Sequence, residues 1–472
     1  MTTDPKVTFS REHVGGWGMA VGGQAEVFRP ASSEQIAAAF ESSDDPIALR
    51  GNGRSYGDAS MATGGKVLDL TAMNRILAFD AETGIARVEP GVRIRDLWRH
   101  SIAFGYWPPV VPGTMQVTVG GAVSMNVHGK NCSQVGPFGD CVRSLRLLTP
   151  SGELLDCSRE QNADVFHAVI GGFGMLGCLV EIELKLKRVH SGRMRVWGYP
   201  IRNLEDGFAV LEADRGRADY LVGWCDLYAK GSGLGRGVMH RADQLDAGED
   251  PDGEAMLRPE AQDVPSTLFG LVPKGWIWPG MWCAFQLGMV RTINAVKVRA
   301  GYKEGRDSPY LQTHGAFHFL LDYVPRWQWM TKPGGLIQFQ PFVPLAQSHV
   351  LREVVEQAQA AGFSPYLGVL KRHREDDYLM SHGLEGYSLA IEFGVPRSEA
   401  RRKKLWELTF RLADHVLDHG GKFYWAKDAT LRPQDFERVH GAEAIATFKG
   451  LKERLDPRDR LQTDLSRRLF RH

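Results

Sequence analysis

The chain has 472 residues, with 57 Lys or Arg against 56 Asp or Glu, so its formal net charge is +1. This balance provides no basic field that would attract nucleic acid, and nucleic acid is therefore not an expected partner. The length exceeds the size at which one hydrophobic core keeps growing, and it predicts two or three domains.

The N-terminus lacks the charged and then apolar order of a secretory signal, and no apolar run reaches the ~18 to 20 residues that span a bilayer. We therefore expect a soluble protein that is cytoplasmic or peripheral to the cell membrane. The six cysteines include no C-x-x-C pair and no close clustering with histidine, which indicates neither a disulfide framework nor a metal site.

The first predicted elements are a short strand near Val27, a helix that Ser32 caps, and a strand at residues 46–49. This strand runs into Arg50-Gly-Asn-Gly-Arg-Ser-Tyr-Gly-Asp58. Because glycine lets successive backbone N–H groups face inward at positive φ, we expect Gly51, Gly53 and Gly57 to build a nest for phosphate oxygens. A Rossmann turn is rejected, since the third glycine comes one place late and no long helix follows.

A second glycine cluster surrounds Gly120 and Gly121, after short strands at 67–70 and 85–88 and a helix at 94–100. The two glycines precede a predicted helix at 122–127, whose free N–H groups favour an anion. Two anion-binding loops about 70 residues apart suit a pyrophosphate better than a single phosphate. The alternation of short strands and helices is typical of an α+β fold.

Later segments add a predicted hairpin (142–148 and 153–156), a glycine-rich bend at 171–177 and a strand at 179–186. The stretch 268–290 concentrates Trp276, Trp278 and Trp282, and its prolines and Lys274 argue against a spanning helix. Tryptophans at this density sit at a membrane interface or around a lipid tail. Burial between two domains is the preferred alternative.

Several glycine-rich loops, Pro112-Gly-Thr, Thr118-Val-Gly-Gly121 and the 171–177 bend, together with the loop at 50–58, resemble the FAD domain of the vanillyl-alcohol-oxidase superfamily. More narrowly, the chain is similar to the subfamily of polyprenylphosphoryl-β-D-ribose 2'-oxidases from about Gly15 to its C-terminus. The motifs that carry this likeness are Gly53-Arg-Ser-Tyr-Gly-Asp58, His128-Gly-Lys-Asn131, Gln338-Phe-Gln340, Ala426-Lys-Asp428 and Asp464-Leu-Ser-Arg-Arg468.

The resemblance implies an α+β, two-domain PCMH-type (vanillyl-alcohol-oxidase-like) FAD-binding fold. The FAD-binding domain is expected to be discontinuous, at residues 1–193 plus 422–472. Residues 194–421 are expected to form a substrate-binding (cap) domain built on an antiparallel sheet.

The implied cofactor is FAD, and no metal is expected. Many relatives outside the subfamily carry the flavin on a histidine of the first loop. Here that loop reads Arg54-Ser55-Tyr56, so we expect noncovalent binding. The residues expected to contact FAD are Arg50, Gly51, Asn52, Gly53, Arg54, Ser55, Tyr56, Gly57, Asp58, Ala59, Gly113, Thr118, Val119, Gly120, Gly121, Met125, Asn126, Val127, His128, Leu179 and Tyr424.

Oxidising a sugar hydroxyl requires a base for the hydroxyl proton and a cation where the reduced flavin becomes anionic. Lys427 aligns with the active-site lysine of the subfamily; its alternative interpretation is a surface lysine paired with Asp428. Tyr56 and His128 are the proton-handling candidates, since a histidine titrates near neutrality. His128 is equally well interpreted as a packed residue that holds its loop.

The substrate-binding candidates are Gln338, Gln340, Lys371, Ala390, Glu392 and Lys427. The two glutamines alternate along one predicted strand, which puts them on one face, as a lining requires; the alternative is a solvated sheet face. Ala390 and Glu392 stand where mycobacterial members have a cysteine and an aspartate. Covalent capture by the nitroaromatic inhibitors of that family is therefore not expected.

The expected activity is oxidation of the 2'-hydroxyl of a polyprenylphosphoryl-β-D-ribose to the 2'-keto sugar, the first half of epimerisation to the arabinose donor for cell-wall arabinan. A separate NADH-dependent short-chain reductase is the expected partner, and peripheral membrane contact is left open. One alternative is an aldonolactone or sugar-alcohol oxidase that uses oxygen. The other, from a different class, is a non-catalytic flavin-binding accessory protein.

Overall fold

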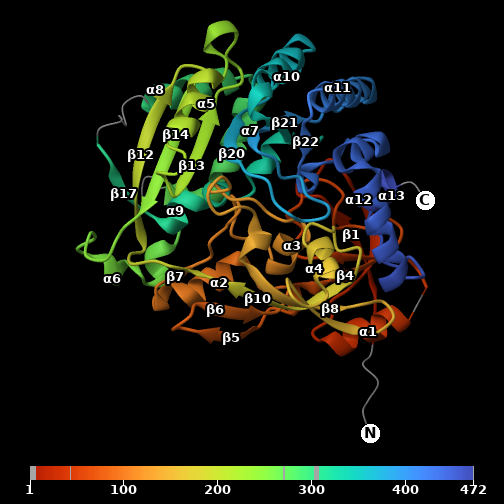
Figure 1. The fold of residues 1–472 in the computed structure, drawn as a ribbon. Coiled ribbons are helices and arrows are strands. Elements are labelled where there is room, and N and C mark those ends of the chain that lie inside the picture. The colour runs from red at the N-terminus through yellow and green to blue at the C-terminus, as the bar shows by residue number, and fades with distance from the viewer. Residues whose placement is uncertain (1–6, 43, 269–271, 302–307, 471–472) are drawn as a thin grey trace.

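The computed structural model describes residues 7–42, 44–268, 272–301 and 308–470. Residues 269–271 of the tryptophan-rich stretch lie outside the described residues. Three principal sheets organise the chain (Figure 1). Two of them come from the first 190 residues, and the third comes from the remainder.

The first sheet holds the predicted anion loop at the end of one of its strands. Its order is β1-β2-β4-β3, with β4 parallel to both β2 and β3. The strands are β1 (Ser10–Gly15), β2 (Gly22–Phe28), β3 (Ile47–Arg50) and β4 (Lys66–Asp69). The intervening helix α1 (Ser33–Glu41) begins at Ser32, whose hydroxyl accepts the Gln35 N–H, so the predicted N-cap is confirmed.

The second sheet is antiparallel and has the order β5-β6-β10-β8-β9. Its strands are β5 (Ile76–Asp80), β6 (Ile85–Val88), β8 (Val142–Leu148), β9 (Leu154–Ser158) and β10 (Cys178–Lys185). The connecting helices are α2 (Ile94–Ser101), α3 (Val119–Ser124) and α4 (Ala163–Val169). The predicted hairpin at 142–156 and the strand after the 171–177 bend are confirmed.

The third sheet has nine strands, all paired antiparallel, in the order β17-β12-β14-β13-β20-β21-β19-β22, with β18 also paired to β21. Its strands are β12 (Arg193–Ile201), β13 (Tyr220–Cys225), β14 (Gly237–Gln244), β17 (Tyr310–Thr313), β18 (Leu336–Phe339), β19 (Pro341–Pro344), β20 (Gly368–His373), β21 (Gly386–Gly394) and β22 (Lys422–Phe423). The antiparallel sheet expected for the cap domain is therefore present.

The two faces of this sheet have different neighbours. Helices α5 (Leu204–Ala213), α10 (His349–Ala360) and α11 (Glu399–Asp418) pack on one face (Figure 1). Since side chains alternate along a strand, Leu389 and Ile391 of β21 enter that core, while Ala390 and Glu392 face a large cavity on the other side. The cavity therefore lies between the nine-stranded sheet and the first two sheets.

Short elements complete the chain: β7 (Tyr106–Trp107), β11 (Lys187–Arg188), β15 (Thr267–Leu268), β16 (Val272–Pro273), α6 (Gly253–Met256), α7 (Ile277–Gln286), α8 (Val290–Gly301), α9 (His314–His318), α12 (Pro433–Leu455) and α13 (Asp464–Leu469). Helix α12 contains a kink at Gly441, whose φ is 77°.

The C-terminal helices return to the first sheet, beside which Figure 1 shows α12 and α13. The Ile47 N–H donates to the Arg460 carbonyl, and Asp464 accepts hydrogen bonds from Thr63. We propose on this basis that residues 1–193 plus 422–472 form the FAD-binding domain and that 194–421 form the cap. Residues 422–423 are shared, because β22 pairs at the edge of the nine-stranded sheet.

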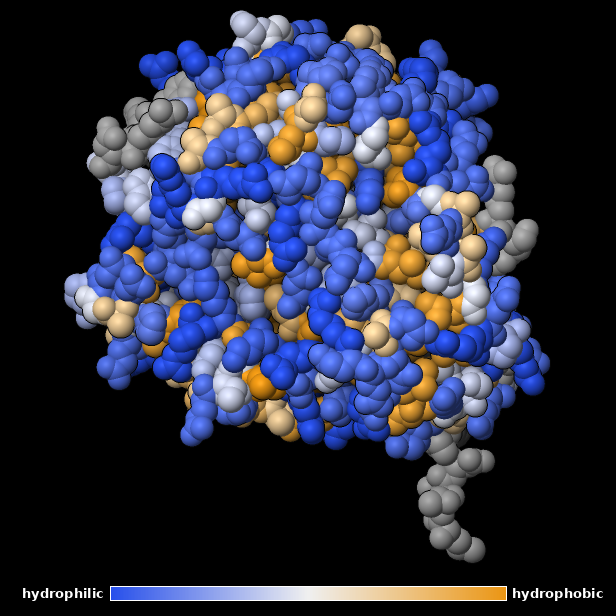
Figure 2. All heavy atoms as spheres, viewed as in Figure 1, coloured by the Kyte–Doolittle hydropathy of each residue, from blue (hydrophilic) through white to orange (hydrophobic). Residues whose placement is uncertain are grey.

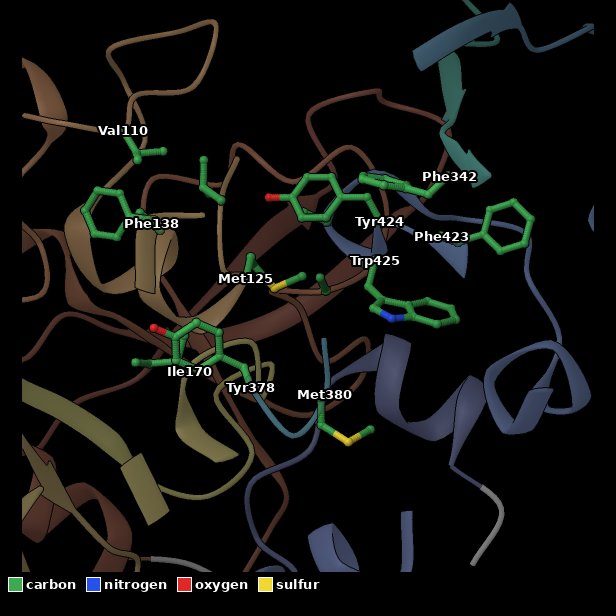
Figure 3. Packing of buried hydrophobic residues seen from close by; sticks show 14 of the residues in the cluster. Val110, Met125, Phe138, Ile170, Phe342, Tyr378, Met380, Phe423, Tyr424 and Trp425 are labelled. Carbon is green, nitrogen blue, oxygen red and sulfur yellow. The ribbon is translucent and has the colours of Figure 1, made fainter. Parts of the chain in front are cut away.

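One large hydrophobic core runs through both parts of the molecule. Figure 3 shows Met125 near Tyr424, with Phe342 of the cap sheet close to both Tyr424 and Phe423. Outside, the face in Figure 2 is mainly hydrophilic, with separate small groups of hydrophobic residues. Within the described residues, no helix has both the length and the apolar character needed to cross a bilayer.

Candidate active site

A single continuous cavity of about 840 Å³ joins the predicted anion loop to the inner face of the nine-stranded sheet. The loop at 50–56 lines one end of it, and Gln338, Lys371 and Glu392 line the sheet side. A cavity of this size falls within the range of ligand sites in proteins. Most of the residues predicted to bind cofactor or substrate share this wall: Arg50, Gly51, Asn52, Gly53, Arg54, Ser55, Tyr56, Ala59, Gly113, Thr118, Gly120, Gly121, Met125, Val127, His128, Leu179, Gln338, Gln340, Lys371, Ala390, Glu392, Tyr424 and Lys427.

The first glycine loop is only partly the predicted nest. Of its three glycines only Gly53 has a positive φ, at 60°. Gly57 is required for another reason: a Cβ there would collide with the Asp428 carbonyl oxygen. The loop is thus shaped by one left-handed residue and by close packing against the segment that carries Lys427.

The second glycine loop differs from the prediction in where its helix begins. Helix α3 starts at Val119, three residues before the predicted start, and Thr118 caps it by accepting the Gly121 N–H. The Val119 and Gly120 N–H groups donate to the carbonyls of Val92 and Pro90. The expectation of free N–H groups at this helix start is therefore wrong, because the protein's own backbone already accepts them.

Four predicted cofactor-contacting residues lie outside the cavity wall, and each has a structural partner instead. Gly57 packs on Asp428, and Asp58 binds Arg468 through two contacts of 2.8 Å. Val119 is fully buried in the core. The Asn126 side chain accepts the Gly139 N–H. These residues hold the two loops in shape, and their contact with the cofactor stays a prediction.

Arg468 joins the two loops that meet at the cavity. Its guanidinium binds both carboxylate oxygens of Asp58 and, at 2.8 Å, Oδ2 of Asp428. Asp428 Oδ1 in turn accepts the N–H groups of Thr430 and Leu431. The alternative interpretation of Lys427 as a surface lysine paired with Asp428 is therefore wrong, since Arg468 pairs with Asp428 and Lys427 lines the cavity.

Lys427, Tyr56, Glu392 and Gln338 form one polar cluster. The Lys427 ammonium lies over the Tyr56 ring, with Nζ 3.8 Å from the ring centre. The Tyr56 hydroxyl and the Gln338 amide both donate to Glu392 Oε1, at 3.3 and 2.8 Å. Glu392 Oε2 is buried and has no hydrogen-bond partner in the part of the chain that the structure describes.

Burial changes the acidity of every member of this cluster that titrates. It raises the pKa of Glu392 to about 7, against the opposing effects of Lys427, Gln338 and Tyr56. It lowers the pKa of Lys427 to about 7, against the effect of the Glu392 carboxylate. Burial, and then Glu392, raises the pKa of Tyr56 well above its usual value, so Tyr56 stays protonated at neutral pH and donates.

His128 belongs to a second chain of polar contacts in the same wall. Lys371 Nζ lies 3.2 Å from His128 Nδ1, and Gln340 Nε2 lies 3.0 Å from His128 Nε2. Gln340 also contacts Ser388, whose hydroxyl lies 2.7 Å from His373 Nε2. Gln338 and Gln340 are both buried, so the alternative of a solvated sheet face is wrong.

The protonation of His128 follows from its neighbours. Burial, and then the charge of Lys371, lowers the pKa of His128 well below its usual value, so the ring is neutral. An ammonium only donates, so His128 Nδ1 accepts from Lys371 and Nε2 carries the proton. The structure places the Gln340 amide nitrogen at Nε2, so a hydrogen bond from Nε2–H requires the amide to present its oxygen there instead. Both ring nitrogens are thus occupied, which leaves His128 without a free lone pair for base catalysis.

Cys132 joins this cluster, although sequence spacing indicated no grouping of cysteine with histidine. Its sulfur and the nearest ring nitrogens of His128 and His373 lie within 4.8 Å of one another. The strand β20 brings His373 to the 128–132 segment. The thiol donates to the Gly129 carbonyl at 2.9 Å, and the nearby Lys371 ammonium opposes a metal cation, so we assign no metal here.

An apolar part of the wall was not predicted. Trp17 packs on Tyr56 and Trp327, with ring centres 4.8 and 5.0 Å apart. These residues come from distant segments, so no local periodicity marks them as neighbours.

The position of His373 could have been predicted from the sequence, because His373 follows Lys371 by two residues on one strand and therefore lies on the same face. Other wall residues that sequence reasoning did not assign to the site include Lys130, Trp224, His240, Phe285, His318, Met330 and Tyr366.

The loop at 50–56 has the groups that a pyrophosphate needs. The backbone N–H groups of residues 52–55 find no acceptor among the described residues. Arg54 Nε is buried and also lacks a partner there. Four neighbouring donors and a guanidinium in one cavity wall match the acceptor oxygens of phosphate groups. The residues present therefore fit the pyrophosphate of FAD, and Tyr56, the next residue of the same loop, brings Lys427 to this wall through the contact of its ring with the ammonium.

A family model described as an FAD binding domain matches residues 25–158, the segment that contains both glycine loops. Fold, cavity and family model together define an FAD-dependent oxidoreductase with a PCMH-type, two-domain α+β fold. The chain is similar to decaprenylphosphoryl-β-D-ribose oxidase from Mycolicibacterium smegmatis, with 27% identity over 474 residues and 96% of each chain covered. The resemblance predicted from five motifs is thereby confirmed.

Two further relatives show how far the likeness extends. An uncharacterized protein in the mprA 5' region of Streptomyces coelicolor is 28% identical, over 78% of this chain and 97% of that protein. Cytokinin dehydrogenase 2 of Arabidopsis thaliana is 26% identical, over 47% of this chain and 46% of that protein. Similarity to the oxidase from M. smegmatis thus extends over 96% of the chain, whereas similarity to cytokinin dehydrogenase 2 covers 47% of it.

Proposed function

We propose that this chain oxidises the 2'-hydroxyl of a polyprenylphosphoryl-β-D-ribose to the 2'-keto sugar. The observation that carries the proposal is the joint presence of a polar cluster and an apolar wall in one cavity that also contains the pyrophosphate loop. A sugar phosphate with a prenyl tail has the same two chemical parts. Similarity over 96% of the chain to an oxidase of decaprenylphosphoryl ribose supports this substrate class.

When bound, FAD supplies the two-electron acceptor for the carbinol carbon. Lys427 provides a cation at the reacting end of the cavity, and its place over the Tyr56 ring keeps it directed into the site. Gln340 and Lys371 are the proposed contacts of the sugar hydroxyls. These assignments keep Lys427 in a catalytic role, whereas His128, predicted to handle protons, instead holds Lys371 and Gln340 in place.

Glu392 is the proposed general base, a role that the sequence had not assigned to it. Its Oε1 is held by Tyr56 and Gln338, Oε2 has no partner among the described residues, and the residue forms part of the cavity wall. A pKa of about 7 places it near the value at which a base works best at neutral pH. The hydroxyl proton moves to the Glu392 carboxylate, and Tyr56 keeps its own proton throughout.

FAD is proposed to be bound noncovalently, because the loop at 50–59 contains neither histidine nor cysteine. The keto product requires a second enzyme that reduces it from the opposite face. We propose a separate NADH-dependent short-chain reductase as that partner.

Anaerobic bleaching of the flavin tests the proposal. Farnesylphosphoryl-β-D-ribose should bleach the purified yellow enzyme, and borodeuteride reduction of the product should place deuterium at C2'. Aldonolactones and sugar alcohols serve as comparison substrates. Bleaching by these compounds, with peroxide formed in air, would instead support the oxygen-using sugar oxidase and overturn the proposed substrate class.

A further inference from the structure

An apolar surface surrounds the mouth of the cavity. Helix α7 has the sequence Ile277-Trp-Pro-Gly-Met-Trp-Cys-Ala-Phe-Gln286, and none of its residues is buried. The preferred expectation of burial between two domains is met only in part, since Trp278, Met281, Trp282 and Phe285 are half-buried and Trp278 packs on Trp329. An apolar helix whose large side chains stay partly exposed marks an interaction surface.

The exposed side chains of this surface are large. Trp276 is 77% exposed, Leu287 is 74% exposed and Val296 of the following helix α8 is 64% exposed. Helix α8 anchors the surface, since Val290, Asn294 and Val298 on its other side are buried. Asn294 donates to Asp226 and to the Tyr366 carbonyl, at 2.9 and 3.0 Å.

The same surface opens into the active-site cavity. Ile293 and Leu320 are both exposed to solvent and part of the cavity wall. Met281 and Phe285 of α7 line the wall further in. Apolar side chains therefore connect the outer surface to the cavity wall.

The charged residues of this surface indicate whether its partner is a membrane or another protein. Residues 272–299 contain no Asp or Glu, and their cations are Arg291, Lys297 and Arg299, together with Lys274, which is buried. Arg291 and Arg299 are exposed on α8. Three tryptophans, aliphatic side chains and cations without acidic residues are the composition of a helix that lies in the interface of an anionic bilayer. A protein partner or a second copy of this chain would not require the complete absence of acidic residues.

We propose that α7 and α8 dock the enzyme on a bilayer containing anionic phospholipids, with the cavity mouth facing the acyl chains. This inference rests on the proposed function, because a prenyl-phosphate sugar resides in a membrane. The cavity has the size of a site for one drug-sized ligand and also receives FAD, so a long prenyl chain extends through the mouth. Docking lets the tail stay in the bilayer while the sugar reaches Glu392 and Lys427.

Vesicle flotation of the FAD-loaded enzyme tests the proposal. Vesicles of equal parts phosphatidylglycerol and phosphatidylcholine should carry the enzyme upward, and pure phosphatidylcholine should carry at least tenfold less. The double variant Trp276→Ser/Leu287→Ser should lose at least tenfold in binding to the mixed vesicles. The double variant Arg291→Gln/Arg299→Gln should lose the preference for phosphatidylglycerol.

The matched control is Phe104→Ser/Leu154→Ser, which removes two exposed hydrophobic residues of the FAD-binding part. It should float like the wild type, and flavin content and circular dichroism check the fold of every variant. Failure of the wild type to float, equal loss in the control, or unchanged binding of Trp276→Ser/Leu287→Ser would overturn the proposal. A dimer that this variant dissociates, without vesicle binding, would identify a second copy as the occupant instead.

A failure of the proposed function would be detected by flavin bleaching, not by vesicle flotation. Bleaching by farnesylphosphoryl ribose uses a short substrate in solution and needs no vesicle. Trp276 and Leu287 lie outside the cavity wall, so their variant should bleach at the wild-type rate. Vesicle binding without bleaching would contradict the proposed substrate. Bleaching without vesicle binding would contradict the proposed docking of α7 and α8 on a membrane.

Discussion

The Lys427 ammonium lies over the face of the Tyr56 ring, with Nζ 3.8 Å from the ring centre. The two residues are 371 positions apart, and they meet because the Tyr56 N–H donates to the Ala426 carbonyl at 2.9 Å. Lys427 is thus positioned by the loop that was predicted to bind the cofactor phosphates. Its replacement should affect chemistry more than folding.

Lys427→Met should lower the rate of flavin reduction by about 10²–10³-fold, the effect of removing one preorganised electrostatic group from an active site. FAD should remain bound, since the pyrophosphate loop is unchanged. Stopped-flow absorbance under anaerobic conditions measures the rate, and the flavin spectrum measures occupancy. Lys404→Met, on the exposed side of α11, is the matched control. Retained turnover in Lys427→Met would remove this residue from the mechanism.

The pH dependence of reduction should be bell-shaped around pH 7. As the base, Glu392 must be deprotonated, so the rate rises as pH increases through its raised pKa of about 7. Lys427 must stay protonated, so the rate falls as pH increases through its lowered pKa of about 7. Because these groups interact, the two apparent values belong to the pair. A profile that stays flat from pH 5 to 9 would contradict both assignments.

Glu392→Gln should move the alkaline limb of this profile to lower pH. The Glu392 carboxylate raises the pKa of Lys427, so removing its charge lets Lys427 lose its proton earlier. The same variant should reduce the maximal rate by about 10²–10⁴-fold, the usual contribution of a general base. Glu392→Asp, which restores a carboxylate, should recover part of the rate. An alkaline limb that does not move would show that the two groups do not interact.

Arg468→Met should destabilise the protein by about 3–5 kcal/mol, because it leaves the buried Asp58 and Asp428 carboxylates without a counter-charge. Urea unfolding followed by flavin fluorescence measures the change and detects cofactor loss at lower denaturant. Arg467→Met is the neighbouring control, since Arg467 makes longer contacts of 3.1 to 3.5 Å with Gln462, Thr63 and Asp464. Equal losses of stability in both variants would show that the ion pairs of Arg468 with Asp58 and Asp428 contribute no more than the contacts of Arg467.

Acid precipitation should release the flavin into the supernatant. The loop at 50–59 has no histidine or cysteine to form a bond with the isoalloxazine ring. Absorbance of the supernatant and of the redissolved pellet measures the partition. A yellow pellet would contradict noncovalent binding and would direct attention to His128, His240 and His318, the histidines of the described cavity wall.

Local chemistry in the sequence was sufficient for the cap of α1 and for the position of the first glycine loop, although not for the exact backbone shape of that loop. Ser32 caps α1 as predicted, because capping depends on residues within one turn. The glycines of the 50–58 loop and the missing histidine were likewise visible in the sequence. The α+β class and the FAD-binding domain followed from these motifs in order.

Tertiary structure decided which polar residues meet in the cavity. Glu392 was predicted only as a substrate contact, and its proposed role as the base depends on hydrogen bonds from Tyr56 and Gln338, residues far away in the sequence. The raised pKa of Glu392 and the lowered pKa of Lys427 arise from burial, which no local pattern encodes. The helix start at Val119 differed from the prediction because distant carbonyls accept its N–H groups. The sequence by itself determined the cofactor class, and long-range packing decided which side chains face the cavity, since that depends on how distant strands pair.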